Sequence, residues 1–182
     1  MKDLSLHILD IVHNSISAKA AFIEIAIVES HPENLYQLTI SDNGKGIAPE
    51  MLHNVTDPFV TSRKTRKVGL GLSLLKQNAE RSGGSLEVQS VVGKGTTVIC
   101  RFEHNHLDRP AIGDISGVLV QLLAAFPKVH FIFSHQTQHG SYILDSHEVN
   151  DVLEGVSPGE PGIRQYLLEM IDENLDKIGI ER

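Results

Sequence analysis

The sequence predicts an α+β protein: a two-layer α/β sandwich with a mixed sheet, followed by a small α/β unit. Segments with helical and strand periodicity follow one another in the first half as helix, hairpin, glycine loop, basic loop, helix and hairpin. That order differs from the strand and helix alternation of a doubly wound parallel sheet. Hydrophobic residues make up 41% of the 182 residues and aromatic residues only 5%, so we expect a sizeable aliphatic core.

Apolar side chains recur every three or four residues in the predicted helices of the first half. These helices cover residues 3–20, 50–56 and 70–82. The predicted strands alternate apolar and polar residues and form two hairpins. They cover residues 22–28, 35–41, 85–90 and 96–102, with a turn over residues 29–34 in the first hairpin. Residues 57–68 are polar and basic without a period, which predicts a mobile loop.

A change of composition over residues 103–110 predicts a domain boundary. We therefore expect one domain over residues 1–105 and a small C-terminal α/β domain of unknown role over residues 108–182. The elements expected in the second part are helices over 114–126, 146–153 and 162–178, and a hairpin of strands 129–134 and 141–144.

Charge and composition exclude several classes of protein. The net charge of −7 argues against nucleic-acid binding, and the single cysteine, Cys100, excludes an internal disulfide. No secretion signal and no apolar run long enough to cross a bilayer is present, which predicts a cytoplasmic protein without membrane contact. The pairs His104 with His106 and His135 with His139 lack a third ligand at a suitable spacing, so no histidine metal site is predicted.

Asp10 and Asn14 are four residues apart and lie on one face of the first predicted helix. An amide oxygen suits Mg²⁺, and a carboxylate can orient or deprotonate a water or hydroxyl. By themselves the two residues fit equally well an ordinary solvated helix face.

Three glycine motifs follow. Residues 42–47 (DNGKGI) end a strand, where Asp42 could accept a hydrogen bond from an amine and Gly44 and Gly46 let backbone approach a flat ligand. Residues 69–72 (GLGL) open a helix, whose free amides suit an anion, directly after the basic run 63–67. Residues 93–97 (GKGTT) begin the last strand, where a hydroxyl could contact a base. Taken singly, each motif is also a common turn.

As a set, in this order within about 90 residues, these motifs resemble the GHKL ATPase superfamily, and most closely the catalytic ATP-binding domains of histidine kinases. Residues 57–64 (DPFVTSRK) are similar to the phenylalanine box, and 68–76 to the second glycine box. The resemblance covers residues 4–102 and implies the Bergerat ATP-binding fold with ATP and Mg²⁺ as ligands.

The resemblance also implies a role for each matching residue. Asn14 matches the Mg²⁺-binding asparagine, Asp42 the aspartate that binds the adenine amino group, and Thr97 the hydroxyl that supports it. Phe59 matches the aromatic residue at the base of the ATP lid, Lys64 is a lid cation, and Gly69 and Gly71 close over the phosphates. The full expected nucleotide set is Asn14, Ser17, Asp42, Gly44, Gly46, Ile47, Phe59, Lys64, Gly69, Leu70, Gly71, Leu72 and Thr97, with Asp10 as the catalytic candidate.

Two positions depart from the family pattern. Asp10 stands where ATP-hydrolysing members often carry glutamate, and Ser17 stands where many kinases carry lysine or arginine. The helical hairpin with the phosphoacceptor histidine is also not expected, because Asn14 lies so near the start of the sequence.

Two functions follow from the resemblance. The chain is expected to be a stand-alone kinase or ATPase that acts on or through a partner protein. The alternative is a regulatory module without catalysis, in which ATP orders the lid for partner docking. A homodimer is compatible with both.

Overall fold

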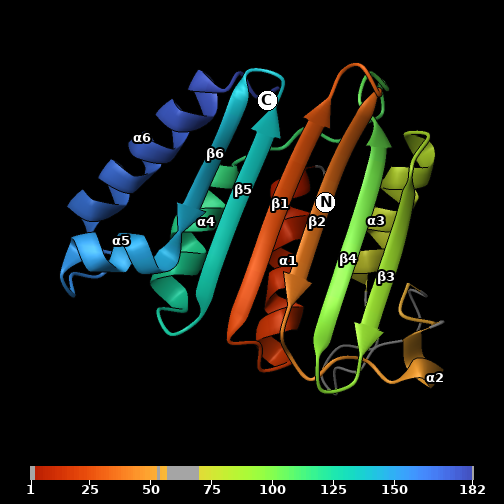
Figure 1. Ribbon diagram of the computed structural model, residues 1–182, viewed down its shortest axis with the longest axis horizontal. Helices are drawn as coiled ribbons and strands as arrows, with labels where there is room; N and C mark the ends of the chain where they lie inside the picture. The colour runs from red at the N-terminus through yellow and green to blue at the C-terminus, as the bar shows by residue number, and fades with distance from the viewer. Residues whose placement is uncertain (1–2, 53, 57–69, 182) are drawn as a thin grey trace.

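The computed structural model describes residues 3–52, 54–56 and 70–181 and shows one six-stranded sheet with helices on one face (Figure 1). The helices are α1 (Leu4–Ser17), α2 (Pro49–Leu52), α3 (Leu70–Arg81), α4 (Ile115–Ala125), α5 (Ser146–Leu153) and α6 (Pro161–Lys177). The strands are β1 (Phe22–Ser30), β2 (Leu35–Asp42), β3 (Ser85–Val91), β4 (Gly95–Glu103), β5 (His130–Thr137) and β6 (Gly140–Asp145).

The sheet has the strand order β3-β4-β2-β1-β5-β6 and is mixed. β1 runs antiparallel to β2, with Ile23 opposite Asp42, and parallel to β5, with Ile23 opposite Phe131. The predicted α+β class with a mixed sheet is confirmed.

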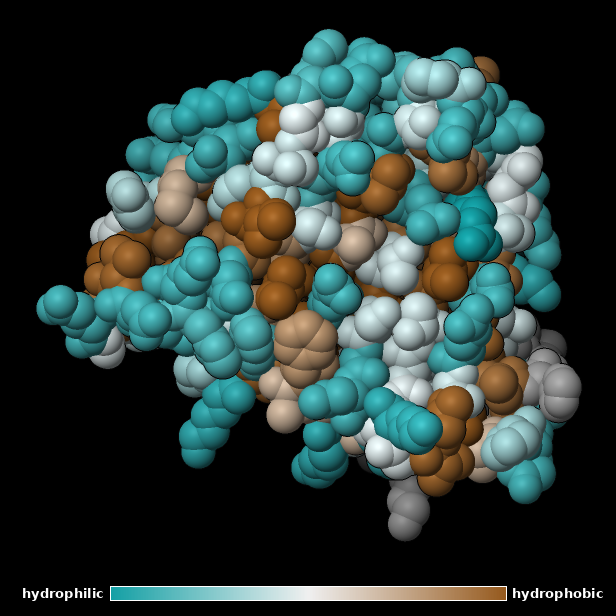
Figure 2. All heavy atoms as spheres, in the orientation of Figure 1, coloured by the Kyte–Doolittle hydropathy of each residue, from teal (hydrophilic) through white to brown (hydrophobic). Residues whose placement is uncertain are grey.

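Helices α1, α3 and α4 lie behind the sheet, and α6 packs against α4 beside the β6 edge (Figure 1). Strand alternation therefore sends Ile23, Ile25 and Ile27 of β1 into the core, each at most 1% exposed. The opposite face has no helix over it, and Figure 2 shows apolar side chains there interspersed with polar ones.

The first hairpin differs from its prediction. The turn is confined to residues 31–34, where Asn34 adopts a φ of 49°, and β1 continues through Glu29 to Ser30. Pro32 and the charged residues around it had predicted a turn that already begins at residue 29. Glu29 instead pairs with Tyr36 and is only 4% exposed, so a carboxylate lies inside the molecule.

The sheet continues across the predicted boundary at residues 103–110. β5 pairs along most of β1, and the backbone amides of Leu4 and Ser5 donate to the carbonyls of Ala111 and Ile112 at 2.9 and 2.8 Å. Buried residues from both parts belong to one core cluster. A separate domain over residues 108–182 remains a prediction about folding, and the shared sheet and core argue against it.

Among the described residues, none of the helices is long and apolar enough to cross a membrane. The predicted basic loop 57–68, with Phe59 and Lys64, and Gly69 lie outside the described residues.

Candidate functional site

Asp42 ends β2 and is held in place by two short hydrogen bonds. Its Oδ2 accepts from the Ser15 hydroxyl of α1 at 2.6 Å, and its Oδ1 accepts from the Gly44 amide at 2.8 Å. Ser15 is 3% exposed, so the bond ties the strand end to the buried side of α1. Sequence reasoning missed Ser15, which is next to Asn14 but points to the opposite side of the helix. The carboxylate is thereby oriented before any ligand arrives.

The loop after Asp42 is fixed by backbone contacts that only glycine allows. A Cβ on Gly44 would lie 2.9 Å from the Ala18 carbonyl oxygen. Gly46 has a φ of 70°, and a Cβ there would lie 2.2 Å from the Val91 carbonyl oxygen. Ile47 contributes its amide, which donates to the Ser90 hydroxyl at 2.8 Å. Gly44 and Gly46 are thus close to the chain's own backbone, and their predicted approach to a flat ligand stays a prediction.

Thr97 lies beside Ser41 on the neighbouring strand. Its hydroxyl lies 3.1 Å from that of Ser41, on the face that no helix covers. Thr96 is the residue paired with Asp42, and its hydroxyl lies 2.8 Å from the Ser90 hydroxyl. Side chains alternate along a strand, so Thr96 shares the inner face with the buried Val98. That alternation was a signal in the sequence which could have identified Thr96.

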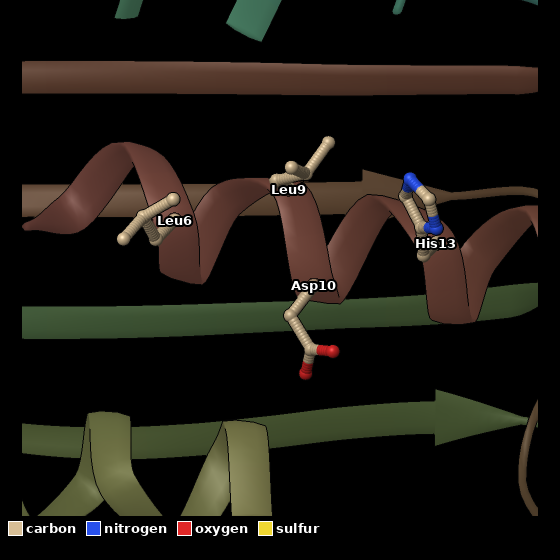
Figure 3. Close-up of a pocket in the computed structure, with 4 residues that line it drawn as sticks. All are labelled: Leu6, Leu9, Asp10 and His13. Atoms are coloured by element: carbon tan, nitrogen blue, oxygen red, sulfur yellow. The ribbon is translucent and has the colours of Figure 1, made fainter. Parts of the chain in front are cut away.

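Asp10 faces the first turn of α3. A Cβ on Gly71 would lie 1.7 Å from Asp10 Oδ2, so a larger residue at this position would move the Asp10 side chain. Figure 3 shows Asp10 projecting from α1 toward α3, away from Leu9 and His13. With Leu6, these residues line a shallow pocket of about 280 Å³. The contact places a carboxylate beside a helix N-terminus, where backbone amides favour negative charge.

Asn14 and Ser17 both lie on the exposed side of α1. The Ser17 hydroxyl donates back to the His13 carbonyl at 2.8 Å, so it stabilises its own helix. Leu72 is half-buried and packs against the core, which makes it a packing residue of α3. Nothing is described of the Leu70 side chain.

His7 is buried beneath Asp10, with Nε2 at 3.0 Å from the Asn78 side-chain nitrogen. Its Nδ1 has no hydrogen-bond partner among the described residues. Burial lowers the pKa of His7 to about 4, so the ring is neutral at physiological pH. The interior next to the site therefore carries no positive charge from this histidine.

Together these residues can recognise two chemical groups. The fixed Asp42 carboxylate can accept a hydrogen bond from an amine, and the first turn of α3 can receive an anion near Asp10 and Asn14. A nucleotide such as ATP carries both groups, an amine on its adenine base and a polyphosphate at its other end.

Comparisons with known proteins agree with this geometry. Residues 2–106 match the family described as "Histidine kinase-, DNA gyrase B-, and HSP90-like ATPase". Sensor protein SrrB of Staphylococcus aureus (strains NCTC 8325 and COL among others) is 46% identical over 84 residues, which are 43% of this chain and 14% of that protein. The chain thus spans about one seventh of the length of these relatives.

Two solved structures are similar. One, described as "Crystal Structure of N terminal domain of a DNA repair protein", has a TM-score of 0.56 at 20% identity over 80% of this chain and 53% of that chain. The other is an Aquifex aeolicus MutL ATPase domain complexed with ADP, with a TM-score of 0.49 at 20% identity over 85% of this chain and 70% of that chain. The first alignment is longer than residues 2–106, so it includes part of the chain after the predicted boundary.

The family match covers more than half of the chain, and it supports ATP binding by this part of the chain. The protein therefore belongs to the histidine kinase-, DNA gyrase B- and HSP90-like ATPase family.

Proposed function

We propose that the chain binds Mg-ATP and transfers the γ-phosphate to a partner protein or to water, as a stand-alone kinase-like protein or ATPase. The observation that carries the proposal is the fixed position of Asp42 at the strand end, facing the inner side of the sheet beside Thr96. The likeness to a part of Sensor protein SrrB agrees with a role in signalling.

In this proposal, Asp42 accepts a hydrogen bond from the adenine amino group, and Thr96 supports the polar contact from the neighbouring strand. The triphosphate lies along α1 toward the first turn of α3. The side-chain oxygen of Asn14 is the proposed Mg²⁺ ligand, which fits its exposed place one helical turn after Asp10. A bound Mg²⁺ would neutralise charge on the phosphates.

Asp10 is the proposed group that orients the attacking hydroxyl or water. Its carboxylate lies on the side of α1 that faces α3, where the γ-phosphate would arrive. Phosphoryl transfer needs positioning and charge neutralisation more than covalent chemistry. Asp10 would supply the positioning of the nucleophile, and a bound Mg²⁺ would supply neutralisation of the phosphate charge.

Titration with ATP and ADP, with and without Mg²⁺, followed by a γ-phosphate release assay on the same sample, tests this proposal. Asp10→Asn keeps the size of the side chain but removes its basicity, so turnover should fall by at least about 100-fold while the Kd for ATP changes little. If Asp10→Asn turns ATP over like the wild type, the catalytic role of Asp10 is wrong.

A regulatory module without catalysis is the second candidate, and one contact favours it. The Asp10 carboxylate lies against Gly71 at the N-terminus of α3, a position that stabilises the helix and leaves less reach toward a nucleophile. In that case ATP binds, but neither phosphate release nor transfer is measured with the wild type. Equal ATP affinity in the wild type and in a variant lacking the Asp42 carboxylate would contradict both candidates.

A further inference from the structure

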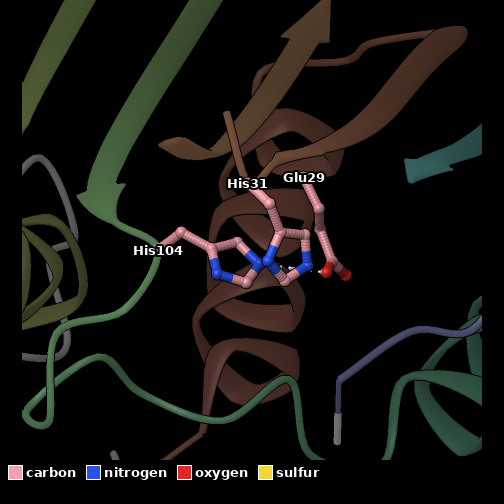
Figure 4. Close-up of side chains that lie close together, drawn as sticks. All are labelled: Glu29, His31 and His104. Carbon is pink, nitrogen blue, oxygen red and sulfur yellow. Dashed lines mark hydrogen bonds and ion pairs between the residues drawn. The ribbon is translucent and has the colours of Figure 1, made fainter. Parts of the chain in front are cut away.

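A second polar cluster lies at the other end of the sheet from Asp42. We call Glu29, His31, His104 and Glu181 the Glu29 cluster. Glu29 is near the end of β1, six residues after Ile23, which pairs with Asp42. The two sites are therefore about 20 Å apart along the strand. Figure 4 shows Glu29 and His31 from the first hairpin meeting His104 from the segment after β4.

The ligand atoms of three residues of this cluster lie close together, and a carboxylate oxygen of Glu181 lies next to one of them. One ligand atom each from Glu29, His31 and His104 lie within 4.8 Å of one another. His104 Nε2 is 3.3 Å from Glu29 Oε2, and His31 Nε2 is 3.8 Å from Glu181 Oε1. Four ligands at about 2.0–2.1 Å from a tetrahedral metal are about 3.3 Å from one another, so these spacings nearly match such a site already.

The orientation of the two imidazole rings also fits a shared ion. The ring centroids of His31 and His104 are 4.1 Å apart and the ring planes are tilted by 47°, so the rings are not stacked in parallel. The second group of possible ligands, around Asp145, fails this test. There His130 and His147 stack at 3.7 Å with planes only 11° apart, and one ion cannot lie in both ring planes.

Surrounding residues hold the cluster in a metal-binding orientation. His104 Nδ1 lies 3.2 Å from Asn105 Oδ1, so Nδ1 can carry the ring proton when a metal ion replaces the hydrogen that Nε2 shares with Glu29 Oε2 at 3.3 Å. His135 Nε2 is 2.7 Å from the other oxygen of Glu29, and Arg109 donates to Glu181 Oε2 at 2.9 Å. Hydrogen bonds of this kind to the ligands are typical of protein metal sites.

Two polar residues are buried opposite each other in the first hairpin. The Tyr36 hydroxyl, opposite Glu29 in the hairpin, is fully buried and has no hydrogen-bond partner among the described residues. Glu29 itself is 4% exposed, and burying a carboxylate is costly unless positive charge compensates it. The side chain of His31 is 39% exposed and provides a path from solvent.

We propose that the Glu29 cluster binds one divalent transition-metal ion, with Zn²⁺ the best match to two imidazoles and two carboxylates. The ion ties the first hairpin, the segment after β4 and the C-terminal end of the chain together. Glu29, His31 and His104 are the three proposed core ligands, and Glu181 is the proposed fourth. With four protein ligands the ion would have a structural role, because no coordination position would remain open.

The test uses the untagged full chain, stripped with a chelator and then titrated with ZnCl₂, and with CoCl₂ as a spectroscopic probe. We expect the wild type to bind one Zn²⁺ per chain. In His31→Gln the affinity for Zn²⁺ should be at least about 100-fold weaker, and the tetrahedral Co²⁺ absorption bands should be lost. His139→Gln is the matched control, since His139 is also an exposed histidine in a hairpin turn, and it should retain the ion.

Two results would overturn the proposal. One is equal Zn²⁺ binding by the wild type and His31→Gln, and the other is equal loss in His139→Gln. Glu29→Gln provides a further check, because it removes the buried ligand and should also abolish the Co²⁺ bands. If wild type and Glu29→Gln have the same metal content, the cluster is an ion-pair network that shares a proton. A circular-dichroism spectrum like that of the wild type shows that each variant has folded.

Discussion

The two ends of the sheet treat buried polar groups in different ways. At the Asp42 end, the carboxylate is held by neutral donors, Ser15 and the Gly44 amide, and the buried His7 contacts a neutral amide. At the other end, the buried Glu29 contacts two histidines, His135 and His104. At the first end only neutral groups contact the carboxylate, whereas at the second end two imidazoles contact it.

The pKa values of the buried groups reflect this difference. Burial raises the pKa of Glu29, but hydrogen bonds and charge from His135 and His104 outweigh it and hold the pKa below its ordinary value of 4.5. His7 has no carboxylate in hydrogen-bond contact, so burial dominates and its pKa falls to about 4. The same physical cost of burial thus yields a charged group at one end and a neutral one at the other.

The largest expected effect concerns His7 and acid. Its pKa is 6.5 in the unfolded chain and about 4 when folded, so the unfolded state takes up more protons as the pH falls between these values. The free energy of unfolding of the wild type should fall by about 2–3 kcal/mol over this range. In His7→Gln, whose side chain does not titrate, the free energy of unfolding should fall by about 2–3 kcal/mol less than in the wild type. Urea unfolding at about pH 7.5 and about pH 4.5 measures the difference.

His7 and Glu29 change the stability of the fold in different ranges of pH. Glu29, whose pKa is lowered, stabilises the fold fully above 4.5 and loses this contribution only as the pH falls below that value. An unchanged acid sensitivity in His7→Gln would show that the loss above that pH comes from other groups.

The next largest effect is expected from Asp42→Asn. The amide keeps one oxygen for the Gly44 amide but loses the charge that an adenine amino group would contact. Hydrogen bonds to charged groups contribute about 1.5–3 kcal/mol, so ATP affinity should fall by about 10-fold to 100-fold. Calorimetric titration measures the affinity, and Asp114→Asn, at the N-cap of α4 away from the site, is the matched control.

The two ends also differ in how much the sequence reveals. Asp42, Gly44 and Gly46 stand together in one motif, and the family resemblance could be recognised from such motifs in their order along the chain. The Glu29 cluster was not predicted, because its four ligands come from three segments that meet only when the sheet and the C-terminal end are in place. The sequence analysis also placed residue 29 in a turn, and therefore did not predict that Glu29 is buried.

The choice between Thr96 and Thr97 likewise depends on contacts that the sequence alone does not show. The motif at residues 93–97 pointed to a hydroxyl, but the choice between Thr96 and Thr97 depends on which face of β4 each occupies. That face is set by the pairing of β4 with β2, in which Thr96 lies opposite Asp42. Helices and strands could be predicted because periodicity is a local property of the sequence. The face of the sheet on which a side chain lies, and its contacts with distant residues, depend on the register between strands.

Replacing Thr96 and Thr97 by valine, one at a time, tests which of the two hydroxyls belongs to the nucleotide site. Thr96→Val removes a hydroxyl beside Asp42 and should weaken ATP binding by about 5-fold, corresponding to about 1 kcal/mol for one hydrogen bond. Thr97→Val removes a hydroxyl on the open face and should leave the affinity unchanged. The same calorimetric titration compares the two variants. A larger loss in Thr97→Val than in Thr96→Val would contradict the assignment of Thr96 to the site.

The smallest expected effect is the coupling between the two ends. Changes at sites more than about 10 Å apart without shared contacts usually add within about 0.5 kcal/mol, and Asp42 and Glu29 lie about 20 Å apart along the strand. His31→Gln should therefore change the Kd for ATP by less than about 2-fold, and Asp42→Asn should leave Zn²⁺ binding unchanged. ATP titrations with and without one equivalent of Zn²⁺ in the wild type complete the comparison. A larger mutual effect would mean that the rigid sheet transmits metal binding to the nucleotide site, so that the second end regulates the first.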